Sequence, residues 1–426
     1  MVNATSLQVV NNCKFSQRFM KPCYDSYCFS NIPATIEFLL TGKGQSALPQ
    51  DVFGDLPTRY DQVIFFFIDA FGWHLFERHA EKHSFLKSIL AQGVVSKMTS
   101  QFPSTTAAHV TCIHTGLDIG QSGIYEWNYY EPLVDDIISP LLFSYVGDRF
   151  VRDTLKQAAI PASAFFPRQT FYHTLLAHGI TSHVIQHQSY TPSTYSGIVL
   201  RDAIVHPYEN LQEAFSRLTE LVTSGHSAPA YYFFYFDRID LACHQHGPYS
   251  QQAEQAINSF LTTTEQLFYK SVYGKSGNTL LIMTADHGQV TVDPQTTYYL
   301  DEQIPGIERY LKTNQKGRPL VPAGSARDMF LYVKEEYLAE AIASLQKHLA
   351  GRAEVYHTQH LLNQHFFGLH KPSPAFLARL GNVVILPYEQ ETVWWHEEGK
   401  FGMAFRGHHG GLTPEEMGIP LLLLPL

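Results

Sequence analysis

The stretch Val63-Ile-Phe-Phe-Phe-Ile-Asp69 decides the fold, because an unbroken apolar run ends there at a carboxylate. The same arrangement recurs in Tyr231-Tyr-Phe-Phe-Tyr-Phe-Asp237 and in Leu280-Leu-Ile-Met-Thr-Ala-Asp-His287. Continuous apolar strands separated by helical stretches are typical of a parallel sheet that is buried on both faces. We therefore predict an α/β fold with a mostly parallel central sheet and helices on both faces.

Helices and a last strand are expected around these runs. Thr106–His114 reads as a short helix that Gly116 stops, and Gln251–Tyr269 reads as a longer amphipathic helix. Thr413-Pro-Glu-Glu416 has the form of a capping box with proline at the first helical position. It leads into an apolar strand at Ile419–Leu424.

The region before the C-terminal segment has a different pattern. It reads as a strand, a helix and a second strand, at Asp328–Val333, Glu336–Ala350 and Asn382–Leu386. Core-like sequence resumes after it at Phe405. We predict a catalytic core of residues 1–298 and 401–426 and an inserted small α+β subdomain of residues 299–400.

Charge and composition limit the partners. The 426 residues include 30 basic and 39 acidic side chains, which give a net charge of -9. This balance argues against a grip on a nucleic-acid polymer through its phosphates. A small phosphorylated substrate stays compatible, because bound metal ions invert the local potential. The sequence fixes no oligomeric state.

The cysteines and the apolar runs indicate the cellular compartment of the protein. The odd number of five cysteines fits a reduced compartment better than a disulfide framework. The N-terminus shows no secretory signal, and the apolar runs are too short to span a bilayer. We therefore expect a cytoplasmic protein with no membrane span.

Polar residues at the ends of the three strands indicate a site. In open α/β sheets, ligands bind outside the carboxyl ends of the strands. Asp69 stands at such an end, before Ala-Phe-Gly, where an aspartate serves either as a metal ligand or as an ordinary turn residue.

A second segment, Phe102-Pro-Ser-Thr-Thr-Ala-Ala-His109, opens the expected helix. A hydroxyl at a helix N-terminus lies where backbone N–H groups and the helix dipole favour an anion. Ser104, Thr105 and Thr106 are all candidates for a nucleophile there. The alternative is that any of them simply caps the helix.

Two more segments supply carboxylates and imidazoles. Asp240 and His244 are four residues apart, so both would face the same way on a helix and could bind one ion, with Asp237 and His246 as rivals. Asp286-His287-Gly288 and Gly407-His408-His409-Gly410 combine metal ligands with glycines that allow close backbone approach.

These segments together predict a site for two divalent ions. Two ions about 4 Å apart would clamp the attacking and leaving oxygens of an in-line displacement at phosphorus. One ion would activate the hydroxyl nucleophile, and the other would stabilise the leaving oxygen.

The ordered motifs Asp, Phe-Pro-Ser-Thr-Thr, Asp-x-x-x-His, Asp-His-Gly and His-Gly resemble those of a known group of enzymes. The chain is similar to the alkaline phosphatase superfamily, and within it to the nucleotide pyrophosphatase/phosphodiesterase branch. The similarity covers residues 61–291 and 405–426.

This resemblance implies roles for particular residues. It makes Thr106 the nucleophile and resolves the alternatives in favour of Asp240, His244 and His409. It implies zinc, or in some members manganese. Asn128 would help to bind a phosphate oxygen, if the spacing from the nucleophile shifts by one residue. The implied ligands are Asp69, Thr106, Asp286 and His287 for one metal, and Asp240, His244 and His409 for the other.

The sequence departs from the family pattern where a nucleobase would bind. Nucleotide-cleaving members have an aromatic residue after the nucleophile, and Ala107 stands there in this chain. Aromatic residues are dense nearby, where we expect them to line a pocket or to pack the sheet edge: Tyr125, Trp127, Tyr129 and Tyr130.

We therefore expect hydrolysis of a phosphodiester or pyrophosphate-type bond through a phosphothreonine intermediate. The first alternative is a phosphomonoesterase or phosphonate hydrolase on the same site, with Arg149, Arg238 and Arg406 as candidates for binding extra phosphate charge. The second alternative is a non-catalytic interaction module of the same fold.

Overall fold

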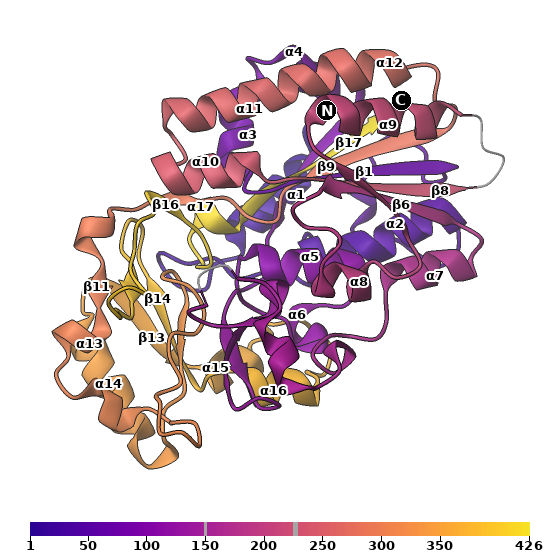
Figure 1. Cartoon of the computed structure of the whole chain (residues 1–426). Helices are drawn as coiled ribbons and strands as arrows, with labels where there is room; N and C mark the ends of the chain where they lie inside the picture. The colour runs from indigo at the N-terminus through magenta and orange to yellow at the C-terminus, as the bar shows by residue number, and fades with distance from the viewer. Residues whose placement is uncertain (149–150, 225–228) are drawn as a thin grey trace.

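A seven-stranded sheet forms the centre of the computed structural model, which describes residues 1–148, 151–224 and 229–426 (Figure 1). Its strands are β1 (Gln62–Ile68), β2 (Val94–Thr99), β6 (Thr181–His187), β7 (Ile204–Tyr208), β8 (Ala230–Phe236), β9 (Thr279–Thr284) and β17 (Gly418–Pro425). Their order is β2-β17-β9-β1-β8-β6-β7. Only β17 runs antiparallel to its neighbours within this described sheet, which confirms the predicted mostly parallel sheet.

The register of the three central strands brings their carboxyl ends together. In β1, Ile68 lies opposite Phe236 of β8, and Phe67 lies opposite Thr284 of β9. All three strands are buried along nearly their whole length, which explains their continuous apolar sequence. The residues that follow these strands therefore meet at one edge of the sheet.

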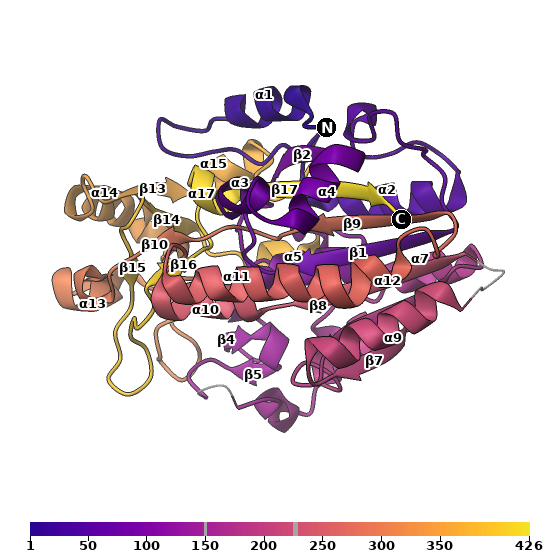
Figure 2. The same ribbon diagram turned by 90° about the horizontal axis from the view of Figure 1, so that it is seen from above.

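Helices cover both faces of the sheet, as predicted (Figures 1 and 2). The predicted long helix is α-helical to Thr263 and continues as a π-helical segment from Thr264 to Tyr269. One face carries α3 (Trp73–Ala80), α4 (Ser84–Gln92), α9 (Leu211–Thr223), α11 (Gln251–Thr263) and α12 (Lys270–Val272). The other face carries α2 (Ile32–Thr41), α5 (Thr106–Thr115), α7 (Phe171–Ala177) and α8 (Thr194–Val199).

Small elements complete the core. α1 (Ala4–Asn12) packs along β2. α10 (Arg238–His246) directly follows β8, and the predicted capping box opens α17 (Pro414–Met417). The others are α6 (Ile119–Ser122) and short sheets of β3 (Tyr129–Glu131), β4 (Asp136–Ser139) and β5 (Ser144–Tyr145), of β10 (Val290–Thr291) and β16 (Gly407–His408), and of β11 (Tyr298–Tyr299) and β15 (Val393–Trp394).

The region predicted as an insert has its own antiparallel sheet, in the order β12-β14-β13, and a separate hydrophobic cluster (Figure 1). In contrast, Phe366, Phe367 and Phe376 belong to the main core, so this region is partly built into the core. The boundaries at residues 299 and 400 stay a prediction. The elements are β12 (Met329–Leu331), β13 (Ala353–His357), β14 (Val383–Pro387), α13 (Leu300–Gln303), α14 (Leu338–His348), α15 (Thr358–Asn363) and α16 (Pro374–Arg379).

One disulfide joins Cys13 to Cys23, so the expectation of reduced cysteines was wrong for this pair. A β-bridge between Lys14 and Met20 turns the chain back and brings the two cysteines together, which their spacing alone did not indicate. Cys28, Cys112 and Cys243 are free and buried. The cytoplasmic location stays a prediction.

The helices are short. The longest α-helices among the described residues, α9 and α11, have 13 residues each. Within that part of the chain, none has both the length and the apolar character needed to cross a bilayer.

A buried ion pair ties the insert to the core. The guanidinium of Arg327 donates from Nε to Oε1 of Glu416 at 3.0 Å and from Nη2 to Oε2 at 2.9 Å. Both side chains are fully buried. Glu416 also accepts from the backbone N–H of Gly411 at 3.0 Å and from the hydroxyl of Thr413 at 2.7 Å. The pair therefore fixes the loop that carries His409.

We expect Arg327→Met to lower the free energy of unfolding by about 3–5 kcal/mol, because it leaves the Glu416 carboxylate buried without its cation. Urea denaturation monitored by circular dichroism measures this change. The exposed pair Arg217–Glu220 provides the matched control, and Arg217→Met should cost less than about 1 kcal/mol. Equal losses in the two variants would show that the buried pair has no special role.

Candidate metal centre

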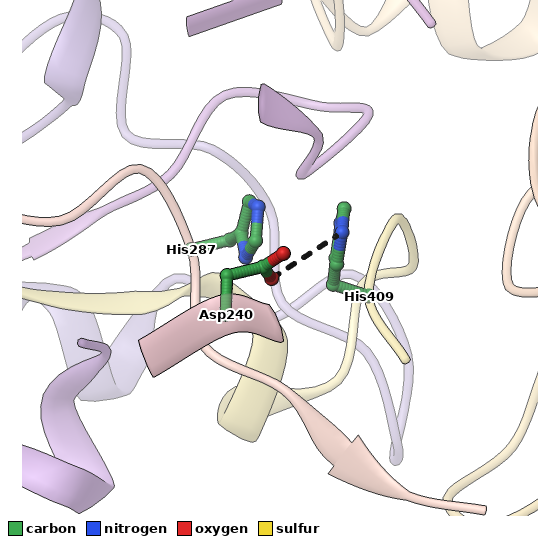
Figure 3. Close-up of side chains that lie close together, drawn as sticks. All are labelled: Asp240, His287 and His409. Carbon is green, nitrogen blue, oxygen red and sulfur yellow. Dashed lines mark ion pairs between the residues drawn. The ribbon is translucent and has the colours of Figure 1, made fainter. Parts of the chain in front are cut away.

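Three carboxylates converge at the carboxyl ends of the central strands. Asp69 directly follows β1, Asp286 lies two residues after β9, and Asp240 lies in the first turn of α10 after β8. Asp286 is fully buried, and Asp69 is 2% exposed. Figure 3 shows Asp240 pointing toward His287 and His409, which come from two other segments.

The first group of potential ligands consists of Asp69, Asp286 and His287, whose ligand atoms lie within 4.8 Å of one another. Nε2 of His287 is 3.1 Å from Oδ2 of Asp286 and 3.6 Å from Oδ1 of Asp69. The hydroxyl of Thr106, at the start of α5, is 3.2 Å from Nε2 of His287 and 3.4 Å from Oδ1 of Asp69. The four side chains predicted for one metal thus lie together.

The second group consists of Asp240, His287 and His409. Nε2 of His409 is 3.9 Å from Oδ1 of Asp240, and the rings of His287 and His409 stack with centroids 3.7 Å apart. His244, which was predicted for this group, lies one turn further along α10, with Nε2 at 3.4 Å from Oδ2 of Asp240. The structure therefore places His287 between the two groups and His244 beside the second.

Backbone carbonyls orient all three histidines in the same way. Nδ1 of His244 donates to the carbonyl of Gly407 at 2.9 Å, that of His287 to Gly288 at 3.1 Å, and that of His409 to Ser104 at 3.0 Å. A proton held on Nδ1 leaves Nε2 as a lone pair. Each Nε2 is turned toward a carboxylate, and this arrangement is typical of metal-binding histidines.

The donor set fits divalent cations. Among the described residues, no lysine or arginine forms an ion pair with Asp69, Asp240 or Asp286. Oδ2 of Asp286 is buried without a hydrogen-bond partner, and it faces the lone pair of His287. Two acceptors that face each other require a cation or a proton between them.

The electrostatics of the protein without metal agree with this interpretation. Burial, followed by the charges of Asp286 and Asp240, raises the pKa of Asp69 well above its ordinary value. Burial alone would lower the pKa of His287, but Asp286 raises it above its ordinary value. Burial would also raise the pKa of Asp286, yet His287 lowers it to about 2. In the metal-free protein, the raised pKa values of Asp69 and His287 thus favour a bound proton where a metal would bind.

The rival residues from the sequence have other partners or other positions. Asp237 accepts a hydrogen bond from the hydroxyl of Tyr190 at 2.5 Å. The Ser104 hydroxyl donates to the carbonyl of Gly411 at 2.8 Å, whereas the Thr106 hydroxyl faces the carboxylates. Burial lowers the pKa of His408 to about 3, and its Nδ1 lies against the backbone of its neighbour.

Asn128 lines a cavity together with Trp127, and Trp127 also lines the cavity beside Thr106. Oδ1 of Asn128 accepts from the hydroxyl of Ser139 at 2.7 Å, so its amide N–H groups stay available for an anion. Of the aromatic residues nearby, Tyr125 and Tyr129 are fully buried and stack on each other, which makes them packing residues.

Two residues that the sequence did not single out contact the carboxylates. The Tyr235 hydroxyl donates to Oδ2 of Asp69 at 2.5 Å, and the Gln289 amide donates to Oδ1 of Asp240 at 2.5 Å. Tyr235 lies within the aromatic run of β8, so its sequence position gave no sign of a polar contact. Gln289 follows the Asp-His-Gly motif directly, and this position was a usable signal.

The α/β fold thus carries, at the carboxyl ends of its central strands, a cluster of carboxylates and imidazoles that could hold metal ions. The sequence model of the type I phosphodiesterase / nucleotide pyrophosphatase family matches residues 63–412. The chain belongs to this family, which confirms the predicted resemblance.

Solved structures of related proteins show the same fold. Murine ectonucleotide pyrophosphatase / phosphodiesterase 5, also determined as an inactive variant in complex with AMP, is 17% identical, with a TM-score of 0.62 over 84% of this chain and 87% of that chain. The human counterpart is 17% identical, with a TM-score of 0.62 over 85% and 87% of the two chains. No curated protein matches the chain by sequence.

We expect Asp240→Asn to lower the metal content of the purified protein, because the neutral amide is a weaker ligand than a carboxylate. Elemental analysis after dialysis against zinc or manganese measures the metal per chain. The control is Asp237→Asn, three residues earlier, whose side chain is bound to Tyr190. A metal content that falls equally in both variants, or in neither, would contradict the placement.

The stability of the metal-free protein should fall as the pH rises above about 4, the ordinary range of a carboxyl group. The reason is that Asp69 has a raised pKa in the folded state, so the folded protein binds this proton more tightly than the unfolded chain. Asp69→Asn should weaken this dependence, and the exposed Asp55→Asn should keep it. Thermal melts in chelator between about pH 4 and pH 8 provide the measurement.

Proposed function

We propose that the chain is a hydrolase that cleaves a phosphodiester or pyrophosphate-type bond through a covalent phosphothreonine at Thr106. The observation that carries this proposal is the position of the Thr106 hydroxyl. It stands at the first residue of α5, 3.2 Å from Nε2 of His287 and 3.4 Å from Oδ1 of Asp69. Family membership supports the class of reaction.

The residues divide into two ligand sets. Asp69, Thr106, Asp286 and His287 would hold one divalent ion, and Asp240, His244 and His409 would hold the other. His287 lies close enough to both groups to contact either ion. Two divalent ions, zinc or alternatively manganese, would supply charge that lowers the pKa of a bound hydroxyl and neutralises phosphoryl oxygens.

The side chains of the protein account for positioning and proton transfer. The Thr106 oxygen attacks phosphorus, a Thr106 O–P bond forms, and the bond from phosphorus to the leaving oxygen breaks. The proton of Thr106 Oγ1 has Asp69 as an acceptor. The phosphoryl oxygens then meet the N-terminus of α5 and the amide N–H groups of Asn128. Water later cleaves the phosphothreonine and restores the hydroxyl.

A diester fits the surroundings of Thr106 better than a monoester. Arg152 is the one lysine or arginine among the described residues that line the cavity beside Thr106. Of the other candidates, Arg238 lies near Asp237 with a half-exposed side chain, Arg406 is exposed, and Arg149 lies outside the described residues. A monoester would leave its second phosphate charge with the exposed Arg152 as its single guanidinium partner from this lining.

We expect Thr106→Ala to abolish turnover of bis(p-nitrophenyl) phosphate and to keep most of the bound metal, because the carboxylates and imidazoles remain. Thr106→Ser should retain measurable activity. Acid quenching of the wild type followed by peptide mass spectrometry should find phosphate on Thr106.

Three results would contradict parts of this proposal. Wild-type rates in Thr106→Ala would exclude this nucleophile. Cleavage of p-nitrophenyl phosphate alone would favour the phosphomonoesterase. A protein with neither metal nor turnover would favour the interaction module.

A further inference from the structure

The disulfide between Cys13 and Cys23 closes a loop that follows α1. We call residues 13–23 the disulfide loop. Within it, the β-bridge between Lys14 and Met20 holds the two arms side by side. The two ligand groups of the metal centre contain no residue of this loop, so the proposed chemistry does not account for it.

One side of the disulfide loop packs on the insert with aromatic rings (Figure 2). Phe19 is 1% exposed, and its ring centroid lies 5.8 Å from that of Tyr388, just after β14. The ring of Phe15 lies 5.1 Å from that of Tyr356 on β13. Because these contacts remove apolar surface from water, they stabilise the position of the loop on the insert.

Polar contacts follow the same path. The Ser16 hydroxyl donates to Oε1 of Glu354 on β13 at 3.0 Å. Arg18 forms an ion pair with Glu389 at 3.0 Å, and both of these side chains are largely in solvent. Exposed pairs of this kind add little free energy, so they fix the register of the contact more than its strength.

The other side of the disulfide loop is bonded to the core. The backbone N–H of Met20 donates to the carbonyl of Leu412 at 2.8 Å, three residues after His409. The backbone N–H of Cys23 donates to Oγ1 of Thr99, the last residue of β2, at 3.0 Å. The loop therefore bridges the core and the insert.

The insert in turn contacts the metal centre. The backbone N–H of Gly324 donates to the carbonyl of Asn128 at 2.7 Å, and the Ser325 hydroxyl donates to the carbonyl of His409 at 3.1 Å. Both donors precede β12, which belongs to the same three-stranded sheet as β13. This sheet therefore connects the contacts of the disulfide loop to the segments that carry Asn128 and His409.

The covalent bond makes the loop ready to bind the insert. Its cysteines are 10 residues apart, and closing a loop of this length restricts the free chain by an entropy worth about a hundredfold in an equilibrium constant. Without the bond, docking of the loop must overcome this entropy itself. Cys13 is partly exposed, whereas Cys23 is 3% exposed, so the Cys13 sulfur is the one that a reductant can reach.

We propose that the disulfide loop is a redox-sensitive clasp, which holds the insert against the core while the bond between Cys13 and Cys23 is intact. A dithiol reductant would open it. One of its thiolates attacks the Cys13 sulfur, the S–S bond breaks, and Cys23 leaves as a thiolate and takes up a proton. The second thiol of the reductant then attacks the mixed disulfide, which frees Cys13 as a thiol and converts the reductant to a disulfide. Two electrons thus pass to the protein.

Hydrogen exchange of the zinc-loaded protein, followed by mass spectrometry, tests the clasp before and after reduction. The reductant is a water-soluble phosphine, because thiolates are themselves metal ligands. A thiol count in denaturant should find three free cysteines before reduction and five after it. Reduction should speed exchange in the disulfide loop by up to about a hundredfold, with smaller accelerations in β13 and at Gly324. Reoxidation should restore the original rates.

Two variants separate the bond from the contacts. The double variant Cys13→Ser, Cys23→Ser should exchange like the reduced wild type and should not respond to the phosphine. Phe19→Ala keeps the disulfide but removes the buried ring, so it should speed exchange in the segment that carries Tyr388. The matched control is Gln17→Ala, at an exposed position of the same loop, which should keep the wild-type rates.

Helix α9 is the internal reference, because it packs on β7, at the opposite edge of the sheet from β2. Unchanged exchange in β13 after complete reduction overturns the clasp, and so does an equal acceleration in α9, which would mean a general loss of stability. Five free thiols before any reduction overturn it at the first step. Unchanged exchange at Gly324 overturns the link to the metal centre.

Acceleration confined to the disulfide loop, β13 and Gly324, and absent from the double variant, supports the clasp. This result does not depend on the reaction at Thr106, because it measures how the insert is held. The same pattern in a protein that cleaves no diester would leave the clasp in place and count against the proposed function alone.

Discussion

The mutual repulsion of three carboxylates, of which Asp69 and Asp286 are buried and Asp240 is partly buried, is the constraint on which the site depends. Asp69, Asp240 and Asp286 meet where burial disfavours their charged forms, and no lysine or arginine among the described residues forms an ion pair with them. Such a cluster persists in a folded protein only if a cation or a proton binds it. The raised pKa of Asp69 and the raised pKa of His287 are two consequences of the same unbalanced charge.

Contacts elsewhere in the fold hold the three carboxylates in place despite this repulsion. Hydrogen bonding along β1, β8 and β9 fixes where the strands end, so the carboxylates cannot move apart without losing the sheet. Close backbone contacts fix the remaining segments, because a Cβ on Gly288 would lie 2.1 Å from the carbonyl oxygen of Glu415. The Arg327–Glu416 pair holds the loop of His409 from the opposite side. Packing, hydrogen bonds and a buried ion pair thus offset the unfavourable free energy of the cluster. Such a locally unfavourable arrangement, stabilised by the rest of the fold, is expected of a functional site.

The sequence predicted what depends on local pattern. The apolar runs predicted the three central strands, and the parallel arrangement then placed Asp69, Asp240 and Asp286 at one edge. The order of the motifs, through the family resemblance, selected Asp240, His244 and His409 from the alternatives that the residues alone left open. What it could not give depends on contacts between distant segments: the pairing of β10 with β16, the position of His287 between both ligand groups, and the Cys13–Cys23 disulfide. Short strands and long-range contacts leave no periodic signal in the sequence.

The helix α5 links the proposed nucleophile to the cavity beside it. Its N-terminus presents Thr106 and an anion-binding set of N–H groups, and its later turns present Val110 and His114 to the cavity. Because a helix is rigid over three turns, the distance from the nucleophile to the cavity wall is fixed by the backbone. A substituent held against that wall therefore fixes the position of its phosphorus relative to Thr106. Binding energy from a remote group can in this way be converted into alignment for attack.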